Sequence, residues 1–128
     1  MKRFGPVVLA LLASGVVSQA LAQPAKIAAT AKGEMLQAPN GMTLYVLDRD
    51  VSGQGKSTCN GDCAKLWPPL AVSDGSKATG DWSVIARDDG TSQWAYKGRP
   101  LYTWSKDTKP GETSGDNFAG GKWHVARP

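Results

Sequence analysis

The chain has few of the residues on which most catalytic and metal sites depend. It contains one histidine and two cysteines. No serine or cysteine has an identifiable base partner in the sequence, so an enzyme with an activated nucleophile is not expected. The 15 basic and 11 acidic residues are scattered without a run of lysine or arginine, which excludes the basic stripe that follows a nucleic-acid backbone. We therefore expect a protein that is not an enzyme and does not bind nucleic acid.

No apolar stretch is long enough to span a membrane. The uncharged stretch at residues 7–17 has about 11 residues, whereas a spanning helix needs roughly 20. It follows a basic pair and precedes the Ala-Leu-Ala sequence of residues 20–22, which is the order of a signal peptide with an A-x-A cleavage site. The sequence predicts that residues 1–22 are a signal peptide cleaved near Ala22/Gln23. Residues 23–128 are then expected to form one soluble, periplasmic or secreted domain without a membrane span.

The mature chain contains an internal repeat, which is the first feature to look for in a sequence. Residues 27–50 align with residues 84–107 without a gap. Glycines, aromatic residues and acids coincide at the places where turns and cores need them. The alignment predicts two repeats, at about 27–70 and 84–128, that form a single domain.

Each repeat has the pattern of a β-meander, because short runs rich in β-branched and aromatic residues are separated by glycine-containing turns. Helix is expected to be nearly absent, with a single turn at residues 62–66 as the main candidate. The predicted fold class is all-β, with two pseudo-repeated antiparallel β-meanders that face one another in one small domain. The predicted strands are residues 27–31, 34–38 and 42–47 in the first repeat and residues 83–87, 93–96 and 100–104 in the second.

Cys59 and Cys63 leave two interpretations open. An even number of cysteines in an oxidising compartment favours a disulfide, and one turn of tight chain brings Cα atoms i and i+4 to about 6 Å, which is within disulfide range. The alternative is a copper or haem site, or a redox pair, in which the two thiolates act with His124. The first interpretation implies no cofactor.

The aromatic residues of the repeats also have two interpretations. Aromatic faces can stack on sugars, peptides or planar cofactors while acids fix polar groups, but aromatic residues equally form the core of a small β domain. Asp50 and Asp107, each at the end of a third strand, are expected to accept backbone N–H groups of the loop that follows. The candidate binding face comprises Tyr45, Trp94, Tyr96, Tyr102, Trp104 and Asp107.

Two segments carry a family resemblance. Residues 102–107 fit the motif Tyr-x-aromatic-x-x-Asp, and residues 57–69 contain a Cys-x-x-x-Cys-x-x-x-Trp-Pro-Pro segment. Both resemble the secreted bacterial repeat proteins often called predicted lipoproteins, and the resemblance covers nearly the whole mature chain. It implies a secreted domain without an established biochemical activity. The chain departs from the pattern at Leu47, where the first copy would have an aromatic residue, and in the lack of a lipidation cysteine at Gln23.

Together these features predict an exported, non-enzymatic binding or accessory module of the cell envelope. Its partner is an unknown envelope ligand or protein, and the sequence does not indicate an oligomeric state. The alternative is a periplasmic copper or haem binding or redox protein that uses Cys59, Cys63 and His124.

Overall fold

The computed structural model of the protein describes residues 24–73 and 76–128. The predicted signal peptide lies outside these residues. None of the helices within the described ranges is long and apolar enough to cross a bilayer.

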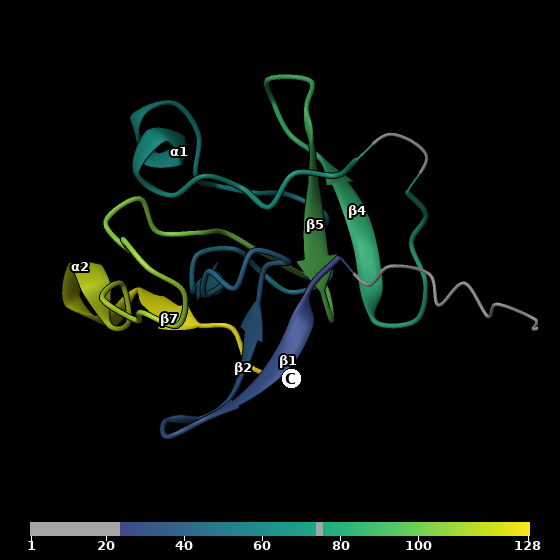
Figure 1. The fold of residues 1–128 in the computed structure, drawn as a ribbon. Coiled ribbons are helices and arrows are strands. Elements are labelled where there is room, and N and C mark those ends of the chain that lie inside the picture. Colours follow the sequence, from purple (N-terminus) through teal and green to yellow (C-terminus); the bar gives the residue numbers. More distant parts are fainter. Residues whose placement is uncertain (1–23, 74–75) are drawn as a thin grey trace, which may run out of the picture.

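The fold is all-β, as predicted, with antiparallel sheets and short helices (Figure 1). Two hairpins dominate it: β1 pairs with β2, β4 pairs with β5, and the two hairpins are neighbours, with β1 beside β4 and β5 around one hollow. The predicted single turn of helix is present as α1, and both short helices lie at the end of the molecule away from β4 (Figure 1). The elements are β1 (Lys26–Thr30), β2 (Gly33–Gln37), β3 (Tyr45–Leu47), α1 (Asp62–Leu66), β4 (Trp82–Ala86), β5 (Ser92–Tyr96), β6 (Arg99–Pro100), α2 (Phe118–Gly121) and β7 (Trp123–Val125).

The closing segment of each repeat pairs with the third strand of the other repeat. In the first repeat, Leu44 accepts a backbone hydrogen bond from Ala126 at 2.8 Å, next to the β3–β7 pair. In the second repeat, Leu101 accepts the matching bond from Leu70 at 2.9 Å. Each hairpin forms within one repeat, whereas each closing segment finds its strand partner in the other repeat.

The third strands are shorter than predicted, since β3 covers Tyr45–Leu47 and β6 covers Arg99–Pro100. The two third-strand segments meet at a pseudo-twofold axis, where Tyr102 follows β6 as an isolated bridge residue. Tyr45 and Tyr102 exchange both backbone hydrogen bonds, at 2.8 and 3.0 Å. Such a doubly bonded pair is the centre of an antiparallel ladder. The two meanders therefore face one another through equivalent residues.

The turns of the two repeats differ in length. The turn after the first strand covers residues 31–32 in the first repeat and residues 88–90 in the second. The turn after the second strand covers residues 39–41 in the first repeat and residues 97–98 in the second. The two differences cancel, so the repeats are again in register at the third strand.

This compensation corrects the gap-free alignment in the central strands. Leu36 corresponds to Trp94, and not to Gln93, because the backbone N–H of each donates to the closing segment of the other repeat. The acceptors are the carbonyls of Ala126 and Leu70, both at 2.9 Å. The predicted register is wrong here by one residue, because the sequence does not reveal turn lengths that change in opposite senses.

The interior contains two clusters of buried side chains. The first is aromatic and lies at the pseudo-twofold axis; the second is aliphatic and lies under the two hairpins. The first comprises Met35, Tyr45, Leu47, Cys59, Trp67, Tyr102, Trp104, Trp123 and Val125, and the second comprises Ala25, Leu36, Ala38, Leu44, Val46, Leu101 and Ala126.

Candidate functional site

Two reciprocal tyrosine–aspartate pairs link the repeats. The hydroxyl of Tyr45 in the first repeat donates to Asp107 Oδ2 in the second at 2.7 Å. The hydroxyl of Tyr102 in the second repeat donates to Asp50 Oδ2 in the first. All four residues are buried, so the first and last residues of the Tyr-x-aromatic-x-x-Asp motif connect the two copies.

The second oxygen of each carboxylate holds the loop that follows its own third strand. Asp50 Oδ1 accepts the backbone N–H and the hydroxyl of Thr58, both at 2.8 Å. Asp107 Oδ1 accepts the same two groups of Ser114, at 3.1 and 2.5 Å. The expected turn-capping role of both acids is therefore present, and each acid also joins a loop to the opposite repeat.

Both tyrosines are held in the neutral form. Burial raises the pKa of Tyr45 and of Tyr102 above the ordinary value, and the carboxylate that accepts each hydroxyl proton raises it further. A phenolate in either position would lie against a carboxylate in an environment of low polarity. These hydroxyls stabilise the fold and do not act as acids near neutral pH.

Three indole rings stack at the centre of the aromatic cluster. Trp67 lies between Trp123, at a centroid distance of 3.8 Å, and Trp104, at 4.1 Å. Phe118 packs on the outer part of Trp104 at 4.7 Å. Trp67 and Trp123 are equivalent in the two repeats, and Leu47 is the residue of the first repeat that corresponds to Trp104.

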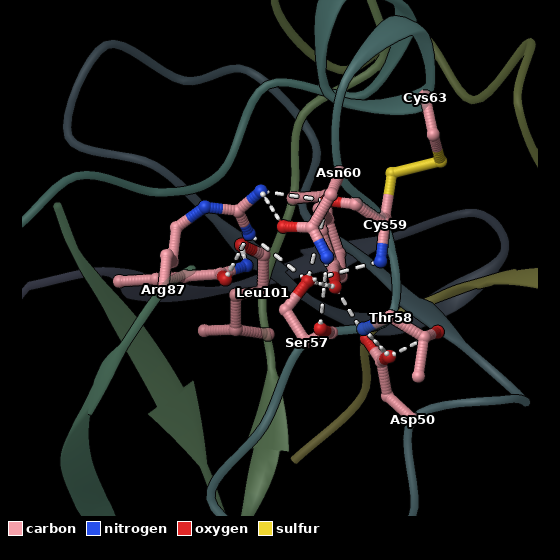
Figure 2. The surroundings of a disulfide bond; sticks show 10 residues. Asp50, Ser57, Thr58, Cys59, Asn60, Cys63, Arg87 and Leu101 are labelled. Carbon is pink, nitrogen blue, oxygen red and sulfur yellow. Dashed lines mark hydrogen bonds between the residues drawn. A yellow bond between two sulfur atoms is a disulfide. The ribbon is translucent and has the colours of Figure 1, made fainter. Parts of the chain in front are cut away.

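A buried arginine connects the disulfide loop to the second repeat (Figure 2). Arg87, which follows β4, donates to Ser57 Oγ at 2.9 Å and to the Cys59 carbonyl at 2.6 Å. It also donates to Gln93 Oε1 at 2.7 Å, and Gln93 in turn donates to the carbonyl of Leu101. Ser57 Oγ lies 2.6 Å from the Tyr102 hydroxyl. The network therefore connects the Tyr102–Asp50 pair with the disulfide loop.

Cys59 and Cys63 form a disulfide in the structure, with a Cα–Cα distance of 5.2 Å. Cys59 is fully buried in the aromatic cluster, whereas Cys63 is half-buried beside it. The sulfur atoms of a disulfide offer no thiolate to a metal. In the disulfide state, Cys59 and Cys63 therefore cannot supply the two thiolates that the alternative copper site would need.

The only histidine lies away from the disulfide. Within β7, Trp123 and Val125 enter the cluster that contains Cys59, so strand alternation turns His124 to the opposite face. Its Nε2 lies 3.0 Å from Asp48 Oδ2. The described residues contain no group of three His, Cys, Asp or Glu side chains that could hold a metal ion. The structure therefore does not bring the three residues of the alternative together.

The residues of the candidate binding face lie mostly inside the protein. Five of the six are buried, and Tyr96 is half-buried against Trp82. Packing accounts for this, because small β domains use large aromatic residues to fill the space between sheets. The buried residues are Tyr45, Trp94, Tyr102, Trp104 and Asp107.

A hollow of about 580 Å³ opens beside Trp123. Its apolar wall is formed by Leu47, Trp123 and Cys63, and its rim carries Asp48, Arg49, Thr58 and Lys122. We call the strands and loop of the first repeat, with the closing segment of the second repeat, the first half of the molecule, and the reverse combination the second half. The hollow lies in the first half, where Leu47 stands instead of an aromatic residue. In the second half, the corresponding Trp104 stacks on Trp67.

Several of these residues have no signal in the sequence. Arg87 and Gln93 are of types usually found at the surface, and nothing in a single sequence shows that they are buried. Arg49 and Lys122 are separated by more than half of the chain. The one available signal was the departure from the motif at Leu47, which marks the hollow only once Trp123 is known to lie beside it.

The fold and the reciprocal pairs define a small all-β protein made of two repeats that exchange their closing segments. A family model described as a secreted repeat of unknown function matches residues 26–71 and 83–127. The chain belongs to this family of secreted repeats. No curated protein and no solved structure matches it.

Proposed function

We propose that the protein is an exported, non-enzymatic binding module of the cell envelope and that it holds a small ligand in the hollow beside Trp123. It acts in the periplasm or outside the cell as a soluble domain, after cleavage near Ala22/Gln23. Membership of a secreted family supports export. The ligand-binding part rests on the hollow.

The observation that carries the proposal is the local break in the pseudo-twofold symmetry. The two halves share their hydrogen-bonded centre and the stacked Trp67–Trp123 pair, but only Trp67 stacks on a further indole, that of Trp104. The first half leaves a concave surface whose volume, about 580 Å³, is within the usual range of small-molecule sites. An apolar wall with a few polar groups at the rim is also typical of such sites.

A binding role without catalysis agrees with the distribution of titratable groups. The two tyrosines have raised pKa values, and their hydroxyls are committed to the fold by bonds to aspartates. Both carboxylates also bind backbone and hydroxyl groups of their own loops. These four buried groups are therefore committed to the fold, and the side chains around the hollow can orient a ligand.

The proposal is tested by ligand binding to the purified mature protein, with the indole N–H signals followed by NMR. A mixture of small planar compounds is expected to shift the Trp123 signal. Leu47→Trp should fill the hollow with the ring that the second half already has, and should abolish the shift. Val84→Trp adds an indole at an exposed position of β4 and should leave binding intact. Binding that persists in Leu47→Trp would contradict the proposal.

A further inference from the structure

The rim of the hollow carries more positively than negatively charged side chains. The lining of the hollow includes two exposed cations, Arg49 and Lys122, and one acid, Asp48. That acid has a partner, because its Oδ2 lies 3.0 Å from His124 Nε2. Among residues 24–73 and 76–128 the close pairs of basic and acidic side chains are the Lys65–Asp62 ion pair and the His124–Asp48 contact. Neither cation at the rim has an acidic partner there.

Strand pairing places these two cations at the same end of the hollow. Leu47 pairs directly with Trp123, and the Asp48 backbone N–H donates to the Lys122 carbonyl at 2.9 Å. Arg49 is the next residue of the first segment. The cations therefore stand where the apolar wall ends, and a bound molecule that lies on this wall would have one end beside them.

The other half of the molecule lacks this combination. The residue equivalent to Lys122 is Leu66, because the Ser105 N–H bonds to the Leu66 carbonyl as the Asp48 N–H bonds to that of Lys122. The position equivalent to Arg49 is Lys106. There Trp104 and Phe118 occupy the space over Trp67. At the place in the second half that corresponds to the hollow, aromatic rings therefore stand over Trp67, and Leu66 replaces one of the two cations.

From this geometry we propose that the hollow beside Trp123 binds a small organic anion with a planar apolar body and one carboxylate or similar acidic group. The body contacts Trp123, Leu47 and the disulfide, and the acidic group lies between Arg49 and Lys122. This ligand class rests on the proposed function, since it requires that the hollow is a binding site. Cations at the edge of an apolar site attract an anion and fix its orientation more than they add affinity.

The test uses three probes with the same ring system: naphthalene-2-carboxylate, its amide, and 2-naphthylmethylammonium. The carboxylate should bind the mature protein about tenfold more tightly than the amide, and the ammonium compound should bind most weakly. Higher salt should reduce the preference for the carboxylate, because exposed charges are screened. Each dissociation constant is measured by NMR titration of the Trp123 indole signal.

Charge-removing variants separate the rim from the wall. Arg49→Gln and Lys122→Gln should each weaken carboxylate binding by about two- to fivefold, the usual range for an exposed ion pair. Both should leave amide binding unchanged. Lys106→Gln is the matched control, because it removes the corresponding charge from the second half. Leu47→Trp should remove binding of all three probes.

The outcomes distinguish the two proposals. If the amide shifts Trp123 with the same affinity as the carboxylate, the hollow is a binding site but the anion is not its ligand class. If no probe shifts Trp123, or if Leu47→Trp binds them normally, both proposals are wrong. An effect of Lys106→Gln as large as that of Arg49→Gln would indicate a general response to net charge and would overturn the anion site.

Discussion

The two halves of the protein hold equivalent loops by different means. The loop of the first half, residues 51–61, ends in the disulfide and is fixed by the guanidinium of Arg87. The loop of the second half, residues 108–121, packs its backbone on the indole stack. A Cβ at Gly115 would lie 2.7 Å from the ring of Trp67, and the Gly115 N–H bonds to the Tyr45 hydroxyl. A covalent and polar anchor in one half thus corresponds to close aromatic packing in the other.

This difference shows which parts of the duplicated fold can change. The tyrosine–aspartate pairs and the exchanged closing segments lie at the pseudo-twofold axis and are the same in both halves. Residues around them differ: Met35 matches Gln93, and Leu47 matches Trp104. Because central residues contact their own equivalents across the axis, a change there disturbs both halves, whereas a peripheral change disturbs one. The hollow lies in the part that is able to diverge.

The largest expected effect breaks the centre that both halves share. Trp67→Ala should lower the free energy of unfolding by about 3–5 kcal/mol, the usual cost of removing a buried tryptophan. Trp67 stacks on two indoles and Trp123 on one, so Trp123→Ala should cost less. Denaturant unfolding of the two variants measures the difference. Equal losses of unfolding free energy would contradict this expectation and would show that the Trp67–Trp104 stacking adds no stability.

High pH should lower the free energy of unfolding through both tyrosine–aspartate pairs alike. The folded-state pKa values of Tyr45 and Tyr102 are raised, whereas the unfolded chain ionises near pH 10. The contribution of each tyrosine is therefore complete below pH 10 and is lost as the pH rises towards the folded-state value. The loss is about 1.4 kcal/mol per tyrosine for each pH unit above 10. Urea unfolding at pH 8 to 11 measures this slope, and Tyr45→Phe or Tyr102→Phe should remove one tyrosine's share of it. A slope unchanged by both variants would contradict the assignment.

At neutral pH the same two variants should differ from each other. Each leaves a buried carboxylate oxygen without its hydroxyl donor, which costs about 1.5–3 kcal/mol for a charged group. Each hydroxyl has a second contact, the Gly115 N–H at 3.3 Å from that of Tyr45 and Ser57 Oγ at 2.6 Å from that of Tyr102. Tyr102→Phe should cost more, because its second contact is shorter and belongs to the Ser57–Arg87 network of the disulfide loop. Equal free energies of unfolding for the two variants would mean that the network adds nothing to the pair in the first half.

Removal of the disulfide should leave the first loop held by noncovalent contacts alone, as the second loop is. Replacement of both Cys59 and Cys63 by alanine should cost about 2 kcal/mol, the chain-entropy estimate for so short a loop. Arg87 should still hold the Cys59 carbonyl, so the protein is expected to fold. Thermal unfolding with and without the substitutions measures the cost. Thiol titration of wild-type protein prepared without reductant should find no free thiol.

The sequence was sufficient for features that depend on local chemistry. Glycine-containing turns between runs of β-branched and aromatic residues located the hairpins, and the helical turn predicted at residues 62–66 is present as α1. The register of the central strands was not predictable, because two changes in turn length compensate each other. The exchange of closing segments was not predictable either, since the same pattern would fit pairing of Leu70 within its own repeat.

The candidate site required long-range information that one sequence does not contain. The aromatic content of the sequence was consistent both with a buried core and with a binding face, so it did not decide that the tyrosines and tryptophans are buried. The hollow arises from Leu47, Arg49 and Lys122, and these residues come together only because β3 and β7 pair across the repeats. The departure from the motif at Leu47 shows where the two repeats differ. Whether the smaller side chain leaves an open space depends on the segment that packs beside it, here β7 with Trp123.

The smallest expected effect concerns the turn between the second and third strands of each repeat. The first half uses Asn40 and Gly41, with the Asn40 side chain accepting the Met42 N–H, whereas the second uses Lys97 and Gly98, both at positive φ. A left-handed conformation is unfavourable for lysine and tolerated by asparagine. Lys97→Asn should therefore raise the free energy of unfolding by roughly 0.5 kcal/mol, part of the gain being offset by loss of the contact between Lys97 Nζ and the Tyr96 ring at 5.4 Å. Lys97→Gln removes the charge without relieving the backbone and serves as the control. If both variants change stability alike, the ring contact and not the turn distinguishes the two halves here.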